Sequence, residues 1–144
     1  MLRVLVIILV FVGALFVFVS RQPEQVFSKS LDGVVEVQGL SRNVRSVTIE
    51  PTKEFGLILK ERVSSYYSLI PDPAGIPFTA DVSVKVLEQW KQAQPDLTEL
   101  SVYKWNEFGS KWEVLPTVVD LSNETLEARM ELQEPTWIAV GVLL

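Results

Sequence analysis

Residues 78–86 read FTADVSVKV, and this stretch decides the fold. Apolar side chains alternate with mostly polar ones, which is the pattern of a β-strand with one face buried and the other in solvent. Residues 125–132, TLEARMEL, repeat the pattern. The inward face expected for this second stretch consists of Leu126, Ala128, Met130 and Leu132. Both stretches therefore predict half-buried strands.

Shorter strand candidates fill much of the remaining chain. They are residues 34–37, 44–49, 56–59, 63–70, 100–105, 111–115 and 137–143. Turn-forming residues separate them, at 32–33, 41–43, 71–75, 106–110 and 122–123. The one stretch of helical composition, residues 87–93, is cut short by Pro95. Eight or nine short strands with no sustained helix predict an all-β protein, an antiparallel Ig-like β-sandwich, with a closed barrel as the alternative.

The N-terminus is of a different kind. From Val4 to Val19 the chain is an unbroken apolar run, VLVIILVFVGALFVFV, between Arg3 and Arg21. A helix of this length covers about 24 Å, and with both arginines reaching to the interface it can just span a hydrocarbon core of about 30 Å. Residues 1–20 therefore predict one transmembrane helix. A cleaved signal peptide is the alternative, although Phe18-Val19-Ser20 does not provide the expected small-x-small end.

The segments that follow complete the domain organisation. Residues 21–25, RQPEQ, are expected to be a short tether, and residues 26–144 to form the β-sandwich domain. With only two residues ahead of Arg3, the usual outcome is a signal-anchor in the cell membrane with the C-terminal domain outside. The lipid bilayer is then the partner of Val4 to Val19.

Composition excludes several chemistries. The chain has 144 residues with no Cys and no His, so disulfides, zinc sites built on these residues, thiol catalysis and His-based triads are impossible. Residues 21–70 carry 7 basic and 6 acidic side chains, whereas residues 71–144 carry 5 basic and 12 acidic ones. This balance argues against nucleic acid as a partner. No carboxylates follow one another at the spacing of a calcium loop, so neither a metal nor another cofactor is expected.

The aromatic residues are the chemically interesting set. Exposed coplanar rings could stack against sugar rings, whereas the alternative is that they pack in the core and at strand edges. The candidate contact residues for a ligand or partner are Trp90, Tyr103, Trp105 and Trp112, with Tyr66 and Tyr67 as further members of the set. Trp90, in the helical stretch, is either a plug over one end of the sandwich or an exposed anchor.

Residues 100–141 follow a recognisable pattern. It runs L-x-V-Y-x-W, a Gly-containing turn, W-x-x-L, V-D, T-L-x-A-x-M and W-x-A-V-G. This pattern resembles the closing hairpins of Ig-like or ZU5-like β-sandwich modules of microbial surface proteins. The resemblance implies an adhesion, interaction or spacer module without an active site.

These observations predict a membrane-anchored, extracytoplasmic β-sandwich that serves as a structural or protein-interaction module of the cell envelope. It is expected not to be an enzyme, because no nucleophile motif, phosphate loop or paired carboxylates stand out. The alternative is a membrane-held carbohydrate-binding module that uses exposed aromatic residues. An envelope protein or a polysaccharide is the expected partner. Asn123-Glu124-Thr125 is an N-glycosylation sequon in an expected turn.

Overall fold

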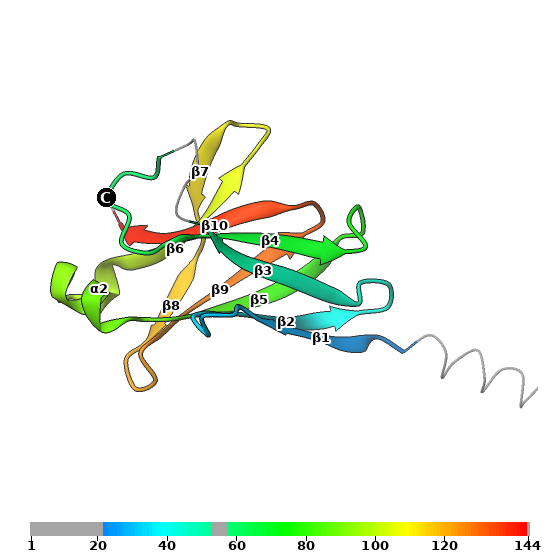
Figure 1. The fold of residues 1–144 in the computed structure, drawn as a ribbon, viewed down its shortest axis with the longest axis horizontal. Helices are drawn as coiled ribbons and strands as arrows, with labels where there is room; N and C mark the ends of the chain where they lie inside the picture. The colour runs from blue at the N-terminus through cyan, green and yellow to red at the C-terminus, as the bar shows by residue number, and fades with distance from the viewer. Residues whose placement is uncertain (1–21, 53–57, 144) are drawn as a thin grey trace, which may run out of the picture.

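A computed structural model describes residues 22–52 and 58–143 as two antiparallel β-sheets packed face to face (Figure 1). Sheet A contains, in spatial order, β1 (Glu24–Lys29), β2 (Val35–Ser41), β5 (Phe78–Lys85), β9 (Thr125–Leu132) and β8 (Thr117–Asp120). Sheet B contains β3 (Ser46–Thr52), β4 (Tyr66–Asp72), β10 (Thr136–Val142), β6 (Leu100–Asn106) and β7 (Lys111–Val114). The described strands thus form a sandwich of two sheets and not one closed barrel.

The expected transmembrane helix, residues 1–20, lies outside the described residues. Within residues 22–52 and 58–143, no helix combines the length and the apolar character needed to cross a membrane.

The two alternating stretches form half-buried strands, as predicted, and these strands, β5 and β9, are neighbours inside sheet A. β5 pairs with β9 along its whole length, with Val84 opposite Leu126 and Ala80 opposite Met130. All four side chains are buried against the inward face of sheet B. The expected inward face of residues 125–132 is therefore confirmed, because every second residue from Leu126 to Leu132 enters the core.

A short helical connection closes one end of the sandwich. The chain passes from β5 in sheet A to β6 in sheet B through α2 (Glu88–Ala93) and the 3₁₀ turn η1 (Leu97–Glu99). Trp90 points from α2 into the core and is 2% exposed. Lys91 Nζ lies 2.7 Å from Glu88 Oε2 and 2.9 Å from Glu124 Oε1, so an ion pair joins α2 to the turn between β8 and β9.

Two strands differ from the sequence expectation. Glu24 and Gln25, expected in the tether, begin β1, and they pair with the end of β2. Neither β1 nor β8 is among the strands expected from the sequence. Both are edge strands of sheet A in which few side chains are buried, so neither has the alternation on which strand prediction depends. Of the expected strand 56–59, Ile58 and Leu59 are not in a strand, and the other two residues lie outside the described ranges.

A hydrogen-bonded carboxylate joins the two sheets. Asp32, in the turn between β1 and β2, accepts hydrogen bonds from Tyr67 Oη at 2.9 Å, from Ser30 Oγ at 2.6 Å and from the Val34 amide at 3.1 Å. Burial tends to raise the pKa of the Asp32 carboxyl, but these hydrogen bonds outweigh it and the pKa lies below its usual value. Burial, and then the nearby Asp32, raise the pKa of the Tyr67 hydroxyl. The pair therefore holds the charged carboxylate against the neutral phenol.

We expect Tyr67→Phe to lower the free energy of unfolding by about 1–3 kcal/mol at neutral pH, because it removes a hydrogen bond to a charged group and keeps the ring in the core. A carboxyl with a lowered pKa stabilises the fold above its ordinary pKa of 3.8, and this contribution is lost as the pH falls through the lowered value. The deficit of the variant should therefore shrink in acid. Thermal unfolding of the full chain in detergent micelles, followed by tryptophan emission across pH 2–7, measures it.

Tyr103→Phe is the matched control for this experiment. Tyr103 Oη donates to the carbonyl oxygen of Val142 at 3.1 Å, so its acceptor does not titrate. The loss in the free energy of unfolding caused by Tyr103→Phe should be the same in acid and at neutral pH. A Tyr67→Phe deficit that is equally independent of pH would contradict the role given to Asp32.

Candidate functional site

Two of the four expected contact residues, Trp90 and Trp105, are buried. Trp90 is in the main core beneath α2, and Trp105 is 6% exposed. Tyr103 and Trp112 are half-buried. Trp90 therefore occupies the position of a plug at one end of the sandwich, and it does not join the other three.

Tyr103, Trp105 and Trp112 do come together, on the outer face of sheet B with Tyr66. Strand register places Trp105 opposite Trp112 and Tyr103 opposite Ala139. The Trp112 ring stacks on Tyr66, with centroids 5.5 Å apart and planes 17° apart, and meets Trp105 edge-on at 5.6 Å and 67°. These are the geometries in which aromatic rings attract one another. Tyr66, Tyr103 and Trp112 form a second, smaller apolar cluster with Leu59 and Ala139, and Trp105 contacts it through the Trp112 ring.

The chain itself covers part of this aromatic cluster. Residues 58–65 run beside β10, where the Val142 amide donates to the Glu61 carbonyl oxygen at 3.0 Å. The Leu59 amide donates to Tyr66 Oη at 3.1 Å, and Arg62 Cζ lies 4.1 Å from the centroid of the Tyr66 ring. The rings thus contact each other and their own chain, and they do not form an exposed coplanar platform.

Close packing over the aromatic cluster depends on a glycine. A Cβ at Gly141 would lie 3.2 Å from Leu59 Cδ2 and 3.3 Å from both Tyr103 Cε2 and the Glu61 carbonyl oxygen. An alanine at this position would fit only if Leu59, the Tyr103 ring and the Glu61 backbone each moved by a few tenths of an ångström.

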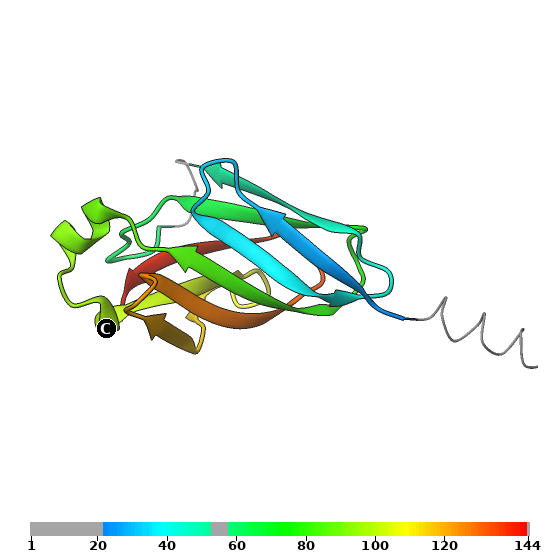
Figure 2. The same cartoon turned by 90° about the horizontal axis from the view of Figure 1, so that it is seen from below.

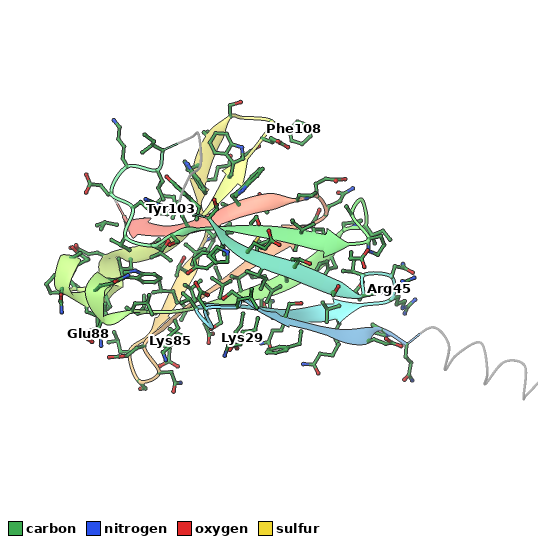
Figure 3. All side chains as sticks on the ribbon, in the orientation of Figure 1. Lys29, Arg45, Lys85, Glu88, Tyr103 and Phe108 are labelled. Atoms are coloured by element: carbon green, nitrogen blue, oxygen red, sulfur yellow. The ribbon has the colours of Figure 1, made fainter. Side chains whose placement is uncertain are left out.

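The outer face of sheet A is open by contrast. Seen from below, its strands lie side by side with no other described segment across them (Figure 2). A groove of about 590 Å³ lies over this face and is lined by residues from all five strands. Lys29, on this face, and Tyr103, on the outer face of sheet B, lie on opposite sides of the molecule (Figure 3).

Strand register arranges the groove in two rows. One row crosses sheet A through Phe27, Gln38, Asp81 and Arg129. The next row crosses it through Glu36, Ser83, Glu127 and Val118. Apolar side chains stand at the two edges, where Phe27 on β1 is 57% exposed and Val118 on β8 is 67% exposed. The groove therefore has a polar floor between two apolar rims.

The cations beside the floor are paired. Arg129 donates from Nε to Asp81 Oδ1 at 2.6 Å and from Nη2 to Asp81 Oδ2 at 3.3 Å, and this contact raises the pKa of Arg129. Lys29 is paired with Glu36. Three other floor side chains are uncommitted, since Gln38, Ser83 and Glu127 make no hydrogen bond or ion pair among the described residues.

The groove residues were missed as a site by the sequence analysis, although part of their signal was present. Asp81, Ser83, Glu127 and Arg129 are the polar half of the alternation in β5 and β9. That alternation shows that each strand has a polar face. It does not show that β2 and β8 lie next to these strands, which is what makes the polar faces into one floor.

Among residues 22–52 and 58–143, no group of three or more acidic side chains is placed to hold a metal ion. The described strands define an all-β protein of two antiparallel sheets, with one outer face partly covered and the other open.

Neither models of protein families, nor curated proteins, nor solved structures match the chain.

Proposed function

We propose that the chain is a membrane-anchored module of the cell envelope, with an extracytoplasmic β-sandwich that acts as a structural or interaction element. The apolar run from Val4 to Val19, flanked by Arg3 and Arg21, supports the anchor. β1 begins at Glu24, so only a few residues separate the end of this run from the sandwich. The domain is therefore held close to the bilayer surface.

The Ig-like or ZU5-like character of the module belongs to the same proposal. The resemblance spans residues 100–141, which run from β6 to β10. The pattern places a turn between two strands that carry aromatic residues. The described β6–β7 hairpin, with Trp105 opposite Trp112, supports the proposed resemblance. Modules of this kind work through their surfaces.

The observation that carries an interaction role is the contrast between the two outer faces. Sheet B is covered in part by residues 58–65, whereas sheet A leaves a groove of about 590 Å³ with uncommitted polar groups and two exposed apolar rims. A concave surface with a few free polar groups is the usual form of a binding site. The sandwich has therefore one face suited to a partner.

Three described carboxyls with displaced pKa values serve as hydrogen-bond acceptors within turns. The described carboxyls with displaced pKa values, Asp32, Asp96 and Asp120, are all shifted downward. Asp96 is hydrogen-bonded by Thr98 and Asp120 by Asn123, so these carboxylates act as turn-forming acceptors.

The experiment is a topology test on the full chain, with an epitope after Leu144. Protease added outside cells or spheroplasts is expected to digest the epitope, and the membrane fraction is expected to hold a product of the full mass, 16.2 kDa plus the epitope. A protected epitope behind an intact membrane would overturn the proposal. A shortened product in the soluble fraction would instead establish a cleaved signal peptide.

Phe11→Arg, at the middle of the apolar run from Val4 to Val19, tests the anchor itself. A charge at the centre of a membrane helix costs about 2.5–3.5 kcal/mol for insertion, so we expect a large fall in membrane association. Leu31→Arg is the matched control, because it adds the same charge outside the apolar run. Leu31 is 97% exposed in the turn between β1 and β2. Equal membrane fractions for both variants would show that the run does not anchor the chain.

A further inference from the structure

We propose that the groove on sheet A binds an uncharged saccharide chain of the cell envelope. The inference rests on the proposed function, since it names the ligand class of an envelope module. It moves sugar recognition away from the aromatic cluster of sheet B, whose rings pack against each other and against residues 58–65.

The rims supply apolar contact. Phe27 stands on β1, more than half exposed, and Val118 stands on β8 across the sheet. A phenyl ring presents a face of negative partial charge, to which the C–H groups on one side of a sugar ring are attracted. Carbohydrates combine such C–H faces with hydroxyl groups at their edges. A ligand of this kind can touch a rim and the floor together.

The floor supplies hydrogen bonds of the matching kind. Gln38 offers two amide donors and a carbonyl acceptor, Ser83 a hydroxyl that both donates and accepts, and Glu127 a carboxylate that accepts. None of these three side chains is engaged by another described residue. Each sugar hydroxyl is itself a donor and an acceptor, so it can meet any of the three. Asp81 and Glu36, held by their cations, add oriented carboxylate oxygens beside them.

The backbone of the floor argues against an extended peptide as the occupant. β2, β5 and β9 each have a strand paired on both sides, so their ladder amides and carbonyls are used within sheet A. Recognition of a peptide by strand addition requires a free sheet edge. The backbone amides of a peptide laid over this face would lose their water and could form hydrogen bonds with side chains, but not with the backbone of these strands.

The charge of the groove argues against a polyanionic polysaccharide. Arg129 and Lys29 are committed to Asp81 and Glu36, and Glu127 has no ion-pair partner within residues 22–52 and 58–143. Anionic groups brought into this field are repelled, whereas uncharged hydroxyls are not. The ligand class is therefore an uncharged glycan.

The test uses the full chain in detergent micelles, titrated by calorimetry with laminarin, galactomannan and dextran, and with dextran sulfate as the charged form of one of these backbones. At least one uncharged glycan is expected to bind at millimolar saccharide, and dextran sulfate is not. Phe27→Ala and Gln38→Ala should each weaken binding about tenfold or more, because each removes a group that would touch the sugar. Both side chains are exposed, so the thermal midpoint should stay near that of the parent chain.

Phe108→Ala is the matched control, because Phe108 is an exposed phenylalanine at the tip of the β6–β7 hairpin, away from the groove (Figure 3). It should bind glycan as the parent does. Absence of binding to every uncharged glycan overturns the inference, as does preferential binding of dextran sulfate. Binding that survives Phe27→Ala and Gln38→Ala but is lost in Trp112→Ala overturns it in favour of the aromatic cluster. The epitope test decides the proposed function separately, so an exposed epitope without glycan binding removes only the saccharide inference.

Discussion

Replacing Val84 with aspartate is expected to unfold the sandwich. Val84 is 1% exposed at the centre of sheet A, with Val35 opposite it on β2 and Leu126 opposite it on β9, both fully buried. A carboxylate at this point would have no partner, and burying an unpaired charge costs several kcal/mol or more even after the site relaxes. A small domain has about 5–15 kcal/mol of stability in total. Met130→Asp, on the same inward face, should have the same result.

Lys85→Asp is the control for both variants. It places an aspartate on the next residue of β5, where the side chain is exposed, and should leave the thermal midpoint almost unchanged. The measurement is thermal unfolding of the full chain in detergent micelles, followed by tryptophan emission. If Lys85→Asp unfolded the protein and Val84→Asp did not, the faces of β5 would be exchanged, as a shift of one residue in register would produce.

Trp90→Ala is expected to lower the free energy of unfolding by about 3–5 kcal/mol, through the cavity left by a large buried side chain. Trp90 is the largest side chain that is almost completely buried, and it closes the core at the end covered by α2. The chain would retain its two sheets but lose the contact of Trp90 with the core, which leaves the ion pair between Lys91 and Glu124 to join α2 to the turn between β8 and β9. Denaturation of the full chain by urea, monitored by the remaining tryptophans, measures the loss.

Two further variants separate the cavity from the helix. Gln89→Ala changes an exposed neighbour in α2 and should alter the free energy of unfolding by no more than about 0.5 kcal/mol. The loss of stability in Trp90→Phe should lie between those of Gln89→Ala and Trp90→Ala, because the phenyl ring fills part of the cavity. A Trp90→Ala protein as stable as the parent would mean that Trp90 contributes little to the core. In that case its role as an anchor for a partner would have to be considered again.

The sequence could predict those strands in which apolar and polar residues alternate along the strand itself. β5 and β9 alternate over eight residues, and their buried faces follow from that alternation alone. β1 and β8 lack it, because an edge strand is in contact with solvent along one side and needs few apolar residues. The helical stretch from Leu87 was also recognisable, since Pro95 limits it to the two turns or fewer that α2 occupies.

The candidate site could not be predicted in the same way, because it depends on which strands are neighbours. Phe27, Gln38, Asp81 and Arg129 come from four strands that are brought into one row by pairing across more than a hundred residues of sequence. Residue type left two interpretations open at Trp105 and Trp112. A tryptophan suits both a sugar platform and an aromatic cluster, and only the position of residues 58–65 separates the two.

The positions at which the described chain enters and leaves the sandwich affect how it bears mechanical load. β1 enters at one end and β10 ends at the opposite end (Figure 1). With the proposed membrane anchor, a pull between the bilayer and a partner held at the far end would therefore act along the strands. The ladder of six facing residue pairs runs from Glu24 opposite Ser41 to Lys29 opposite Glu36, and its hydrogen bonds, formed by alternate pairs, lie across that direction, so they would be sheared together and not opened one by one. Rupture would then be governed by the barrier to sliding the whole β1–β2 ladder, which makes this short first strand a mechanical clamp.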